Sequence, residues 1–274
     1  MLLAIGLSAC AAETPESRGE RIISVAPNLT ELLFAAGAAE QIVAVSEYSD
    51  YPEAAKDLPR IGDAFRLDYE RIVALAPTVA VIWETGTPAG VAKRLEDLGI
   101  RVVGIPTHRL DDIATGLVEL GELAGTQDVA TAAAADFRAR IDRLRTEYQG
   151  RPKLRVFIQI DDAPLYTVGG GHLITEIVEL CGGANVFAEA VSLALPVDLE
   201  SVLVRVPQVV LSTDDGDPVE YWSRFGELEA VRNGAVFRAP ADSLARPSPR
   251  IADGAADVCA LLELARASAA LVPP

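Results

Sequence analysis

Hydrophobic positions in the first half of the chain form short β-rich runs that alternate with segments of helical spacing. The runs that predict strands are Arg21–Val25, Ile42–Val45, Val79–Trp83 and Arg101–Ile105. The segments that predict helices are Asn28–Ala36 with Asn28 as a candidate cap, Tyr69–Leu75, Val91–Leu98 closed by Gly99, and Asp111–Ala124. Such alternation is typical of parallel βαβ units, so an α/β lobe is expected over residues 20–125.

The pattern changes over Thr126–Tyr148, a long run rich in Ala and Arg with no Gly or Pro. This composition is strongly helical. At ~1.5 Å per residue the helix would span roughly 34 Å, about a domain diameter. We expect residues 126–150 to form a rigid connector, because flexible linkers carry Gly, Ser or Pro throughout.

The alternation of strands and helices resumes after Gly150. Strands are expected at Leu154–Ile160, Val209–Ser212 and Ala235–Phe237, and helices at His172–Leu180, Leu199–Val204 and Ile251–Ala270. This pattern predicts a second α/β lobe over residues 151–274.

Two short patterns occur once in each half of the chain. Thr30-Glu31-Leu32-Leu33 is followed by Gly37, and Thr175-Glu176-Ile177-Val178 is followed by Gly182 at the same spacing. Glu70 precedes Pro77 by seven residues, and Glu200 precedes Pro207 by seven. Internal similarity of this kind indicates two lobes of one architecture. A cleft between two lobes is a common place for a ligand.

The segment Met1–Cys10 is apolar but too short to span a bilayer. It resembles the end of a secretory signal, and Leu7–Cys10 resembles a lipoprotein signal in which Cys10 is acylated. A basic stretch before Leu2 is missing, and an ordinary apolar N-terminus is the alternative. Residues 1–19 are therefore expected to be a signal and a tether, and the protein to be periplasmic or extracytoplasmic, anchored through Cys10.

Composition limits the classes of partner. The 274 residues suffice for two domains, and 40 acidic against 24 basic residues give a net charge of −16. This balance argues against nucleic acid and against electrostatic adhesion to anionic lipid, which both require clustered Lys and Arg. It is compatible with a basic partner surface, although acidity also serves simple solubility.

The chain has three cysteines. If Cys10 is acylated, Cys181 and Cys259 remain, and an oxidising compartment allows them to form a disulfide. Such a bond would close a long loop and add on the order of 4 kcal/mol to stability. Two buried free thiols are the alternative. The spacing of Cys and His indicates no metal site.

Signals for catalysis are weak. Gly169–Gly171 precedes a helix but lacks the Lys and Ser/Thr of a phosphate loop. His108 and His172 are single histidines without a Ser-centred elbow, and we take them for surface or loop residues. We therefore expect a protein that is not an enzyme.

Glu70 and Glu200 occupy equivalent positions at the starts of two predicted helices. A first-turn acid is favoured by the helix dipole, which is one explanation for each. If the lobes are pseudo-symmetric, however, the two acids should project from one face at opposite tips. They would then suit a pair of basic pockets on a partner.

Candidate ligand contacts lie in loops and at strand ends, where open α/β sheets bind ligands. They are Tyr48, Asp50, Phe65, Trp83, Tyr166, Asp242 and Arg246. The aromatic side chains offer large apolar contact at low entropic cost, although packing at the hinge would also explain them. Asp242 and Arg246 either hydrogen-bond amides of a ligand or pair with each other.

Taken together, these residues resemble the cobalamin-binding proteins of ABC importers, which belong to a wider family with siderophore and haem receptors. The resemblance covers residues 20 to 268, and the segments that carry it are Arg21–Glu31, Tyr48–Pro52, Glu70–Pro77, Cys181–Phe187 and Ser248–Ile251. It implies two Rossmann-like lobes, each a mostly parallel sheet flanked by helices, joined by one long backbone helix. The cleft between them would move little on binding.

The resemblance also implies roles for particular residues. Glu70 and Glu200 match the acids that dock onto arginines of the permease, and Cys181 and Cys259 match a disulfide. Tyr48, Trp83, Asp242 and Arg246 match positions that line the corrinoid site. The chain departs from the pattern where tryptophans are expected, at Asp63–Arg66 and at Ala194-Leu195, and where an aromatic is expected at Ile160.

The expected function is capture of cobalamin or a related corrinoid between the lobes and its delivery to an ABC permease by a monomer. No cofactor is expected, because the cobalt belongs to the transported ligand. A ferric siderophore or haem receptor is the alternative. Such anionic ligands usually require several Arg or Lys side chains in the cleft, and only Arg246 and Arg66 are obvious candidates for this role. A nucleotide-dependent enzyme and a purely structural lipoprotein are more distant alternatives.

Overall fold

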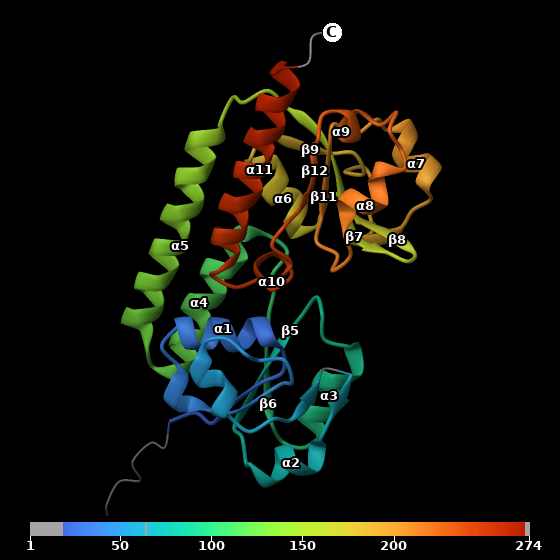
Figure 1. Ribbon diagram of the computed structural model, residues 1–274. Helices are drawn as coiled ribbons and strands as arrows, with labels where there is room; N and C mark the ends of the chain where they lie inside the picture. Colours follow the sequence, from blue (N-terminus) through green and yellow to red (C-terminus); the bar gives the residue numbers. More distant parts are fainter. Residues whose placement is uncertain (1–18, 64, 272–274) are drawn as a thin grey trace, which may run out of the picture.

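The computed structural model describes residues 19–63 and 65–271, arranged as two lobes beside a pair of long helices (Figure 1). The N-terminal lobe contains a parallel sheet in the order β2-β1-β5-β6. Its strands are β1 (Ile22–Ser24), β2 (Ile42–Val45), β5 (Val79–Trp83) and β6 (Arg101–Ile105). A small antiparallel pair, β3 (Gly62–Asp63) with β4 (Arg66–Leu67), lies outside this sheet.

Helices cover both faces of this sheet. They are α1 (Pro27–Ala35), α2 (Tyr69–Ala74), α3 (Ala89–Asp97) and α4 (Leu110–Ala124), with 3₁₀ turns at Ala39–Gln41 and Glu53–Asp57. Side chains of α1 and α4 pack on one face, and side chains of α2 and α3 pack on the other. The assignment of Asn28 as a helix cap is wrong, since α1 begins one residue earlier at Pro27. A proline suits the first helical position, where no backbone N–H is required.

The C-terminal lobe contains a mixed sheet in the order β10-β8-β7-β11-β12, with β9 also paired to β7. The strands are β7 (Leu154–Asp162), β8 (Leu165–Val168), β9 (Gly183–Asn185), β10 (Ala194–Pro196), β11 (Val209–Ser212) and β12 (Val236–Arg238). The antiparallel pairs of β8 with β7 and with β10 are absent from the sequence-based expectation. Both strands are short. β8 follows β7 directly in a hairpin, whereas β10 pairs with β8 across the intervening residues 169–193.

Helices also cover both faces of the second sheet. They are α6 (Leu173–Leu180), α7 (Leu199–Val204), α8 (Pro218–Ser223), α9 (Glu229–Arg232), α10 (Ala241–Leu244) and α11 (Ile251–Leu271). Side chains of α6 and α11 pack on one face, and those of α7, α8 and α9 pack on the other. In the part of the chain that the structure describes, no helix is long and apolar enough to serve as a membrane span.

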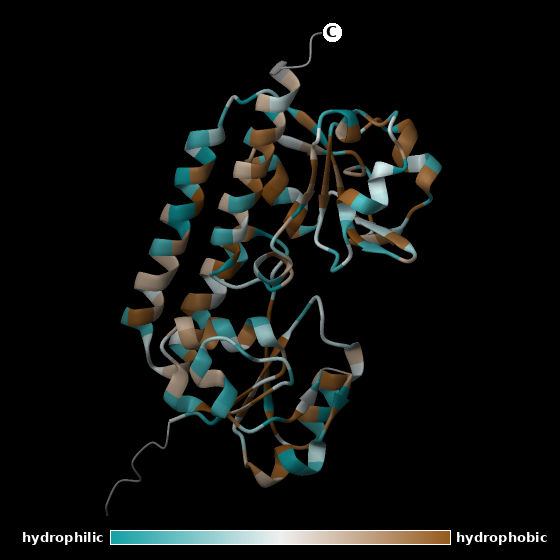
Figure 2. Cartoon of the chain, in the orientation of Figure 1, coloured by the Kyte–Doolittle hydropathy of each residue, from teal (hydrophilic) through white to brown (hydrophobic). Residues whose placement is uncertain are grey.

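The long helix α5 (Gln127–Tyr148) connects the lobes as the sequence predicts. It packs against α4 and α1 of the first lobe and against α6 and α11 of the second. Its buried residues recur every three or four positions: Ala130, Ala134, Phe137, Ile141 and Leu144. Figure 2 shows apolar residues concentrated on the strands and on inward helix faces.

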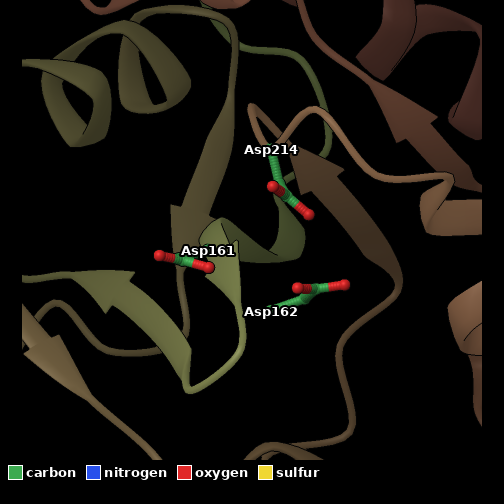
Figure 3. A group of neighbouring side chains, drawn as sticks. All are labelled: Asp161, Asp162 and Asp214. Carbon is green, nitrogen blue, oxygen red and sulfur yellow. The ribbon is translucent and has the colours of Figure 1, made fainter.

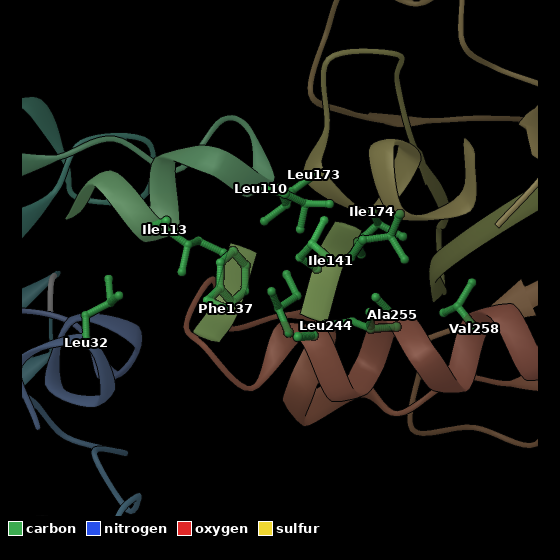
Figure 4. Packing of buried hydrophobic residues seen from close by; sticks show 14 of the residues in the cluster. Leu32, Leu110, Ile113, Phe137, Ile141, Leu173, Ile174, Leu244, Ala255 and Val258 are labelled. Carbon is green, nitrogen blue, oxygen red and sulfur yellow. The ribbon is translucent and has the colours of Figure 1, made fainter. Parts of the chain in front are cut away.

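One hydrophobic core runs through both lobes. Phe137 and Ile141 of α5 lie between side chains of α4, such as Ile113, and side chains of α10 and α11, such as Leu244 and Ala255 (Figure 4). Close packing of this kind resists deformation. We therefore expect the two lobes to keep their relative orientation.

Two pseudo-equivalent glutamates add polar connections between the lobes. Glu31 of α1 accepts hydrogen bonds from Ser248 Oγ (2.6 Å) and Arg250 Nε (2.8 Å), which precede α11. Glu176 of α6 accepts one from the backbone N–H of Leu110 (2.9 Å), the first residue of α4. Glu31 of the N-terminal lobe thus bonds residues just before α11, the last helix of the C-terminal lobe. Glu176 of the C-terminal lobe bonds the start of α4, the last helix of the N-terminal lobe.

The expected disulfide between Cys181 and Cys259 is confirmed, and it joins the end of α6 to α11 with 4.8 Å between the Cα atoms. The bond closes a loop of 78 residues. We expect the double variant Cys181→Ala, Cys259→Ala to lose about 4 kcal/mol of unfolding free energy, because its unfolded chain is less restricted. Urea unfolding with and without reductant measures this loss. Reductant should not affect the variant, and an unchanged midpoint in the variant would contradict the prediction.

Candidate functional site

A cavity of about 400 Å³ lies between the two lobes. Its lining residues are Trp83, Thr85, Thr107, His108, Ile160, Gly171, His172, Leu173, Ile174, Leu193, Thr213, Leu244, Ala245 and Pro247. Trp83 ends β5, Thr107 follows β6 and Thr213 follows β11, so the cavity lies at the carboxyl ends of strands from both sheets. This is where α/β sheets bind ligands.

Trp83 is held rigidly in the cavity wall. Its indole Nε1 donates a hydrogen bond to Thr107 Oγ1 at 2.6 Å. The ring also packs on the backbone of the following turn, where a Cβ at Gly86 would lie 2.1 Å from the ring. Only glycine permits this approach. The turn is closed further by a hydrogen bond from Thr87 N to Trp83 O at 2.8 Å.

Both histidines line this cavity, which the sequence did not indicate. His172 is the N-cap of α6, and its Nδ1 accepts a hydrogen bond from Ile174 N at 3.1 Å. Burial lowers the pKa of His172, so its imidazole is neutral at pH 7. His108 is exposed on the loop between β6 and α4. The glycines before α6 were the sequence feature that could have indicated a site next to His172, because they open a helix N-terminus toward the cleft.

Among the residues that the structure describes, the cavity lining carries no aspartate, glutamate, lysine or arginine. Its polar groups are threonine hydroxyls, two imidazoles and backbone, and the remaining lining side chains are apolar. Hydroxyls and imidazoles hydrogen-bond neutral amides and hydroxyls without requiring a charged partner. The cavity is therefore suited to an uncharged surface of a ligand.

Three of the candidate aromatics lie outside the lining of this cavity. Tyr48 is 74% exposed and Phe65 is 82% exposed. Tyr166 lies within β8, opposite Pro196 of β10, rather than at the end of a segment. Their contacts with a ligand stay a prediction.

Asp50 and Arg246 come together from opposite lobes. Arg246 Nη1 donates to Asp50 Oδ1 at 2.5 Å and lies 3.5 Å from Glu31 Oε1. The hydrogen bond from Arg246 lowers the pKa of Asp50. Arg246 lies between the lining residues Ala245 and Pro247, which places the ion pair at the edge of the cavity.

The suggestion that Asp242 pairs with Arg246 is wrong, because Arg246 pairs with Asp50 and Glu31 among the described residues. Asp242 lies in the first turn of α10, where a negative charge favours the helix dipole. The network from Glu31 to Asp50 was not predicted, since its members are far apart in sequence.

Three carboxylates lie close together at another place, the ends of β7 and β11. Asp161, Asp162 and Asp214 each offer an oxygen within 4.8 Å of the others (Figure 3). Asp161 is exposed and also accepts a hydrogen bond from Ala163 N at 3.2 Å. Exposed acidic side chains often gather without an ion, so this cluster supports no metal site.

Glu70 and Glu200 occupy the same position in two short helices. Each lies in the first turn, two residues after an aspartate N-cap: Asp68 for α2 and Asp198 for α7. Both glutamate side chains are exposed. Figure 1 places α2 and α7 in different lobes and well apart. The two capped helices therefore present two exposed carboxylates at separate places on the surface.

Comparisons with known proteins extend these observations. A family model described as periplasmic binding protein matches residues 22–243. The vitamin B12-binding protein of Vibrio cholerae serotype O1 is 38% identical over 251 residues, 90% of each chain. The protein of that name from Yersinia pestis is 37% identical over 246 residues, which are 89% of this chain and 87% of the relative.

Solved structures agree with these relatives. The crystal structure of the periplasmic vitamin B12 binding protein of Vibrio cholerae superposes with a TM-score of 0.83 at 38% identity, covering 90% of this chain and 98% of the other. A periplasmic heme binding protein from Pseudomonas aeruginosa superposes with a TM-score of 0.74 at 26% identity, covering 88% and 92%.

Proposed function

This chain belongs to the periplasmic binding protein family, and on that premise we propose that it captures cobalamin or a closely related corrinoid between its lobes and delivers it to an ABC permease. The relatives named for vitamin B12 support the ligand class. The observation that carries the proposal is a cavity between the lobes whose lining, within residues 19–63 and 65–271, has no acidic side chain, lysine or arginine. A corrinoid bears many neutral amides, which match this lining. The protein binds and releases its ligand and performs no reaction on it.

The proposed contacts divide into apolar and polar groups. Trp83 supplies a flat apolar wall, and Thr107, Thr213 and His172 supply hydrogen-bonding groups. A corrinoid extends beyond a cavity of 400 Å³, toward the edge where Asp50 and Arg246 pair. We propose that Tyr48, Phe65, Tyr166 and Asp242 contact the part of the corrinoid that extends beyond the cavity.

Haem or a ferric siderophore is the second candidate, because heme-binding proteins share this fold. Their anionic groups require cations that are free to bind. Arg246 is already paired with two carboxylates, and Arg66 lies outside the lining of the cavity. The chemistry of the cavity therefore favours the corrinoid.

Glu70 and Glu200 are the proposed contacts with the permease, one from each lobe. Their equivalent positions, their exposure and their separation suit two basic pockets related by symmetry. The net charge of −16 favours the approach to such a surface. We further propose that the protein is a monomer anchored outside the cytoplasm by acylation of Cys10, which lies outside the described residues.

Calorimetric titration with cyanocobalamin tests the ligand. We expect the protein to bind with a Kd below about 1 μM. The variant Trp83→Ala should bind at least about thirtyfold more weakly, because a buried tryptophan at the centre of an interface contributes ~2 kcal/mol or more. The variant Leu264→Ala, altered at an exposed position of α11, is the matched control and should bind normally.

Parallel titrations with haemin and with a ferric siderophore separate the two candidates. Binding of either compound at submicromolar concentration without binding of cobalamin would replace the corrinoid by the second candidate. If Trp83→Ala and the unaltered protein bound cobalamin equally well, the cavity beside Trp83 would not be part of the binding site.

A further inference from the structure

Each lobe contains an arginine that reaches from the start of its first strand to the end of the helix that carries the exposed glutamate. Arg21 precedes β1, and its Nε and Nη2 donate hydrogen bonds to Ala76 O (3.0 Å) and Leu75 O (2.7 Å). Arg155 of β7 donates from Nε to Val206 O at 2.8 Å. The carbonyls that accept these bonds lie in the turns that end α2 and α7.

The turns themselves have an uncommon backbone conformation. Ala76 has φ of +48° and Val206 has φ of +46°, although neither is glycine. A side chain with a Cβ is disfavoured in this left-handed region, most of all when it is branched as in valine. The next residue is a proline in both turns, Pro77 and Pro207, so the helix cannot continue. A strained turn of this kind persists only where its surroundings hold it.

The backbone repeats the same connection in both lobes. Arg21 N donates to Thr78 Oγ1 at 2.9 Å, and Arg155 N donates to Gln208 Oε1 at 3.1 Å. The carbonyl of Arg21 accepts from Thr78 N (2.9 Å), and that of Arg155 accepts from Gln208 N (2.8 Å). The two arginines are therefore in equivalent places, and the turn residues that accept from them, Ala76 and Val206, follow Glu70 and Glu200 at the same spacing.

The glutamate helices depend on contacts at their ends because they are short. Both α2 and α7 have six residues, and each buries a single side chain, Ile72 or Val202. A helix of this length has little stability of its own. An aspartate caps the N-terminus of each helix, and the arginine bonds carbonyls of the turn at its C-terminus, where a positive charge is also favourable. Arg21 bonds two of these carbonyls, whereas Arg155 bonds one and donates from Nη2 to Glu229 at 3.0 Å.

We propose that Arg21 and Arg155 are positioning residues for docking: they hold α2 and α7 so that Glu70 and Glu200 keep the spacing and direction that the permease requires. This inference rests on the proposed docking role of the two glutamates. The arginines themselves contact the ends of the helices and do not touch the ligand cavity.

The test uses the full-length protein and its cognate ABC permease reconstituted in proteoliposomes, with cyanocobalamin as the ligand. We expect the double variant Arg21→Ala, Arg155→Ala to require about tenfold more binding protein for half-maximal uptake, since hydrogen bonds from a charged group are lost at both helices. The maximal rate and the Kd for cyanocobalamin should stay unchanged. Arg21→Lys with Arg155→Lys should recover part of the loss, because lysine also donates to carbonyls.

Charge-matched controls are Lys93→Ala and Arg224→Ala, which remove one positive charge from each lobe at exposed positions. They should leave uptake unchanged. If the alanine variant does not fold, the lysine variant carries the test, and half-saturation equal to that of the unaltered protein would then overturn the inference.

A double-mutant cycle separates positioning from general loss of structure. In a background that carries Glu70→Ala and Glu200→Ala, the arginine substitutions should have no further effect on half-saturation. An equal effect with and without the glutamates would overturn the inference. If the glutamate substitutions alone leave half-saturation unchanged, the docking proposal itself fails. If the glutamates matter while the arginine variants behave like the controls, only the positioning role fails.

Discussion

The double variant Glu70→Arg, Glu200→Arg is expected to bind cyanocobalamin as tightly as the unaltered protein and to deliver almost none of it to the permease. Each substitution turns the proposed attraction to a basic pocket into repulsion, and like charges placed together at an interface cost several kcal/mol. With both contacts reversed, uptake should fall by at least about a hundredfold. Radiolabelled uptake into proteoliposomes measures delivery, and calorimetry measures ligand binding.

A matched control for this variant is Glu96→Arg with Glu147→Arg. It makes the same change in net charge at exposed positions of α3 and α5. Uptake supported by the control should be close to normal. A loss of cobalamin affinity in the Glu70 and Glu200 variant would mean that these glutamates serve the ligand site. Equal uptake by the variant and the control, with unchanged affinity for cobalamin, would mean that Glu70 and Glu200 serve neither permease docking nor ligand binding.

The variant Glu31→Ala is expected to lose about 3–5 kcal/mol of unfolding free energy, which is the usual cost of removing one partner from a buried ion pair. Only 2% of the Glu31 side chain is exposed. It accepts hydrogen bonds from Ser248, Arg250 and Arg246, so its removal leaves Ser248 and Arg250 without this acceptor, while Arg246 keeps its bond to Asp50. Urea unfolding followed by circular dichroism measures the loss.

The pseudo-equivalent residue Glu176 is the natural control for Glu31. Its side chain is 23% exposed, and its partner Arg109 is 72% exposed, so solvent replaces much of what is lost. Glu176→Ala should therefore cost only about 1 kcal/mol. The combination of Glu31→Ala with Arg250→Ala should cost less than the sum of the single changes, because the two residues share one interaction. Equal losses for Glu31→Ala and Glu176→Ala would contradict this account.

Local pattern in the sequence was sufficient for most of the elements. The runs Ile42–Val45, Val79–Trp83 and Leu199–Val204 form a strand, a strand and a helix with the bounds that their hydrophobic periodicity predicts. The composition of residues 126–148 predicted the long helix α5, which begins at Gln127. These features depend on residues a few positions apart, whose spacing already determines which side chains share a face.

The candidate site was only partly predictable. The position of Trp83 at the end of a buried strand placed it correctly in the wall of the cavity. The same reasoning named Tyr48 and Phe65, which the cavity does not include, because a loop position does not determine where a side chain points. His172 was missed because a single histidine carries no spacing with another group.

The sequence by itself determined that the chain has two similar α/β lobes on a helical connector, since repeated patterns and periodicity are local properties. It also marked Thr30-Glu31 and Thr175-Glu176 as equivalent. Only the tertiary structure decided their purpose: the threonines bind within their own lobe, to Ser24 and Gly169, while the glutamates cross to the other. The partners of Glu31 lie more than 200 residues away, and no local rule specifies which distant groups the folded chain brings together.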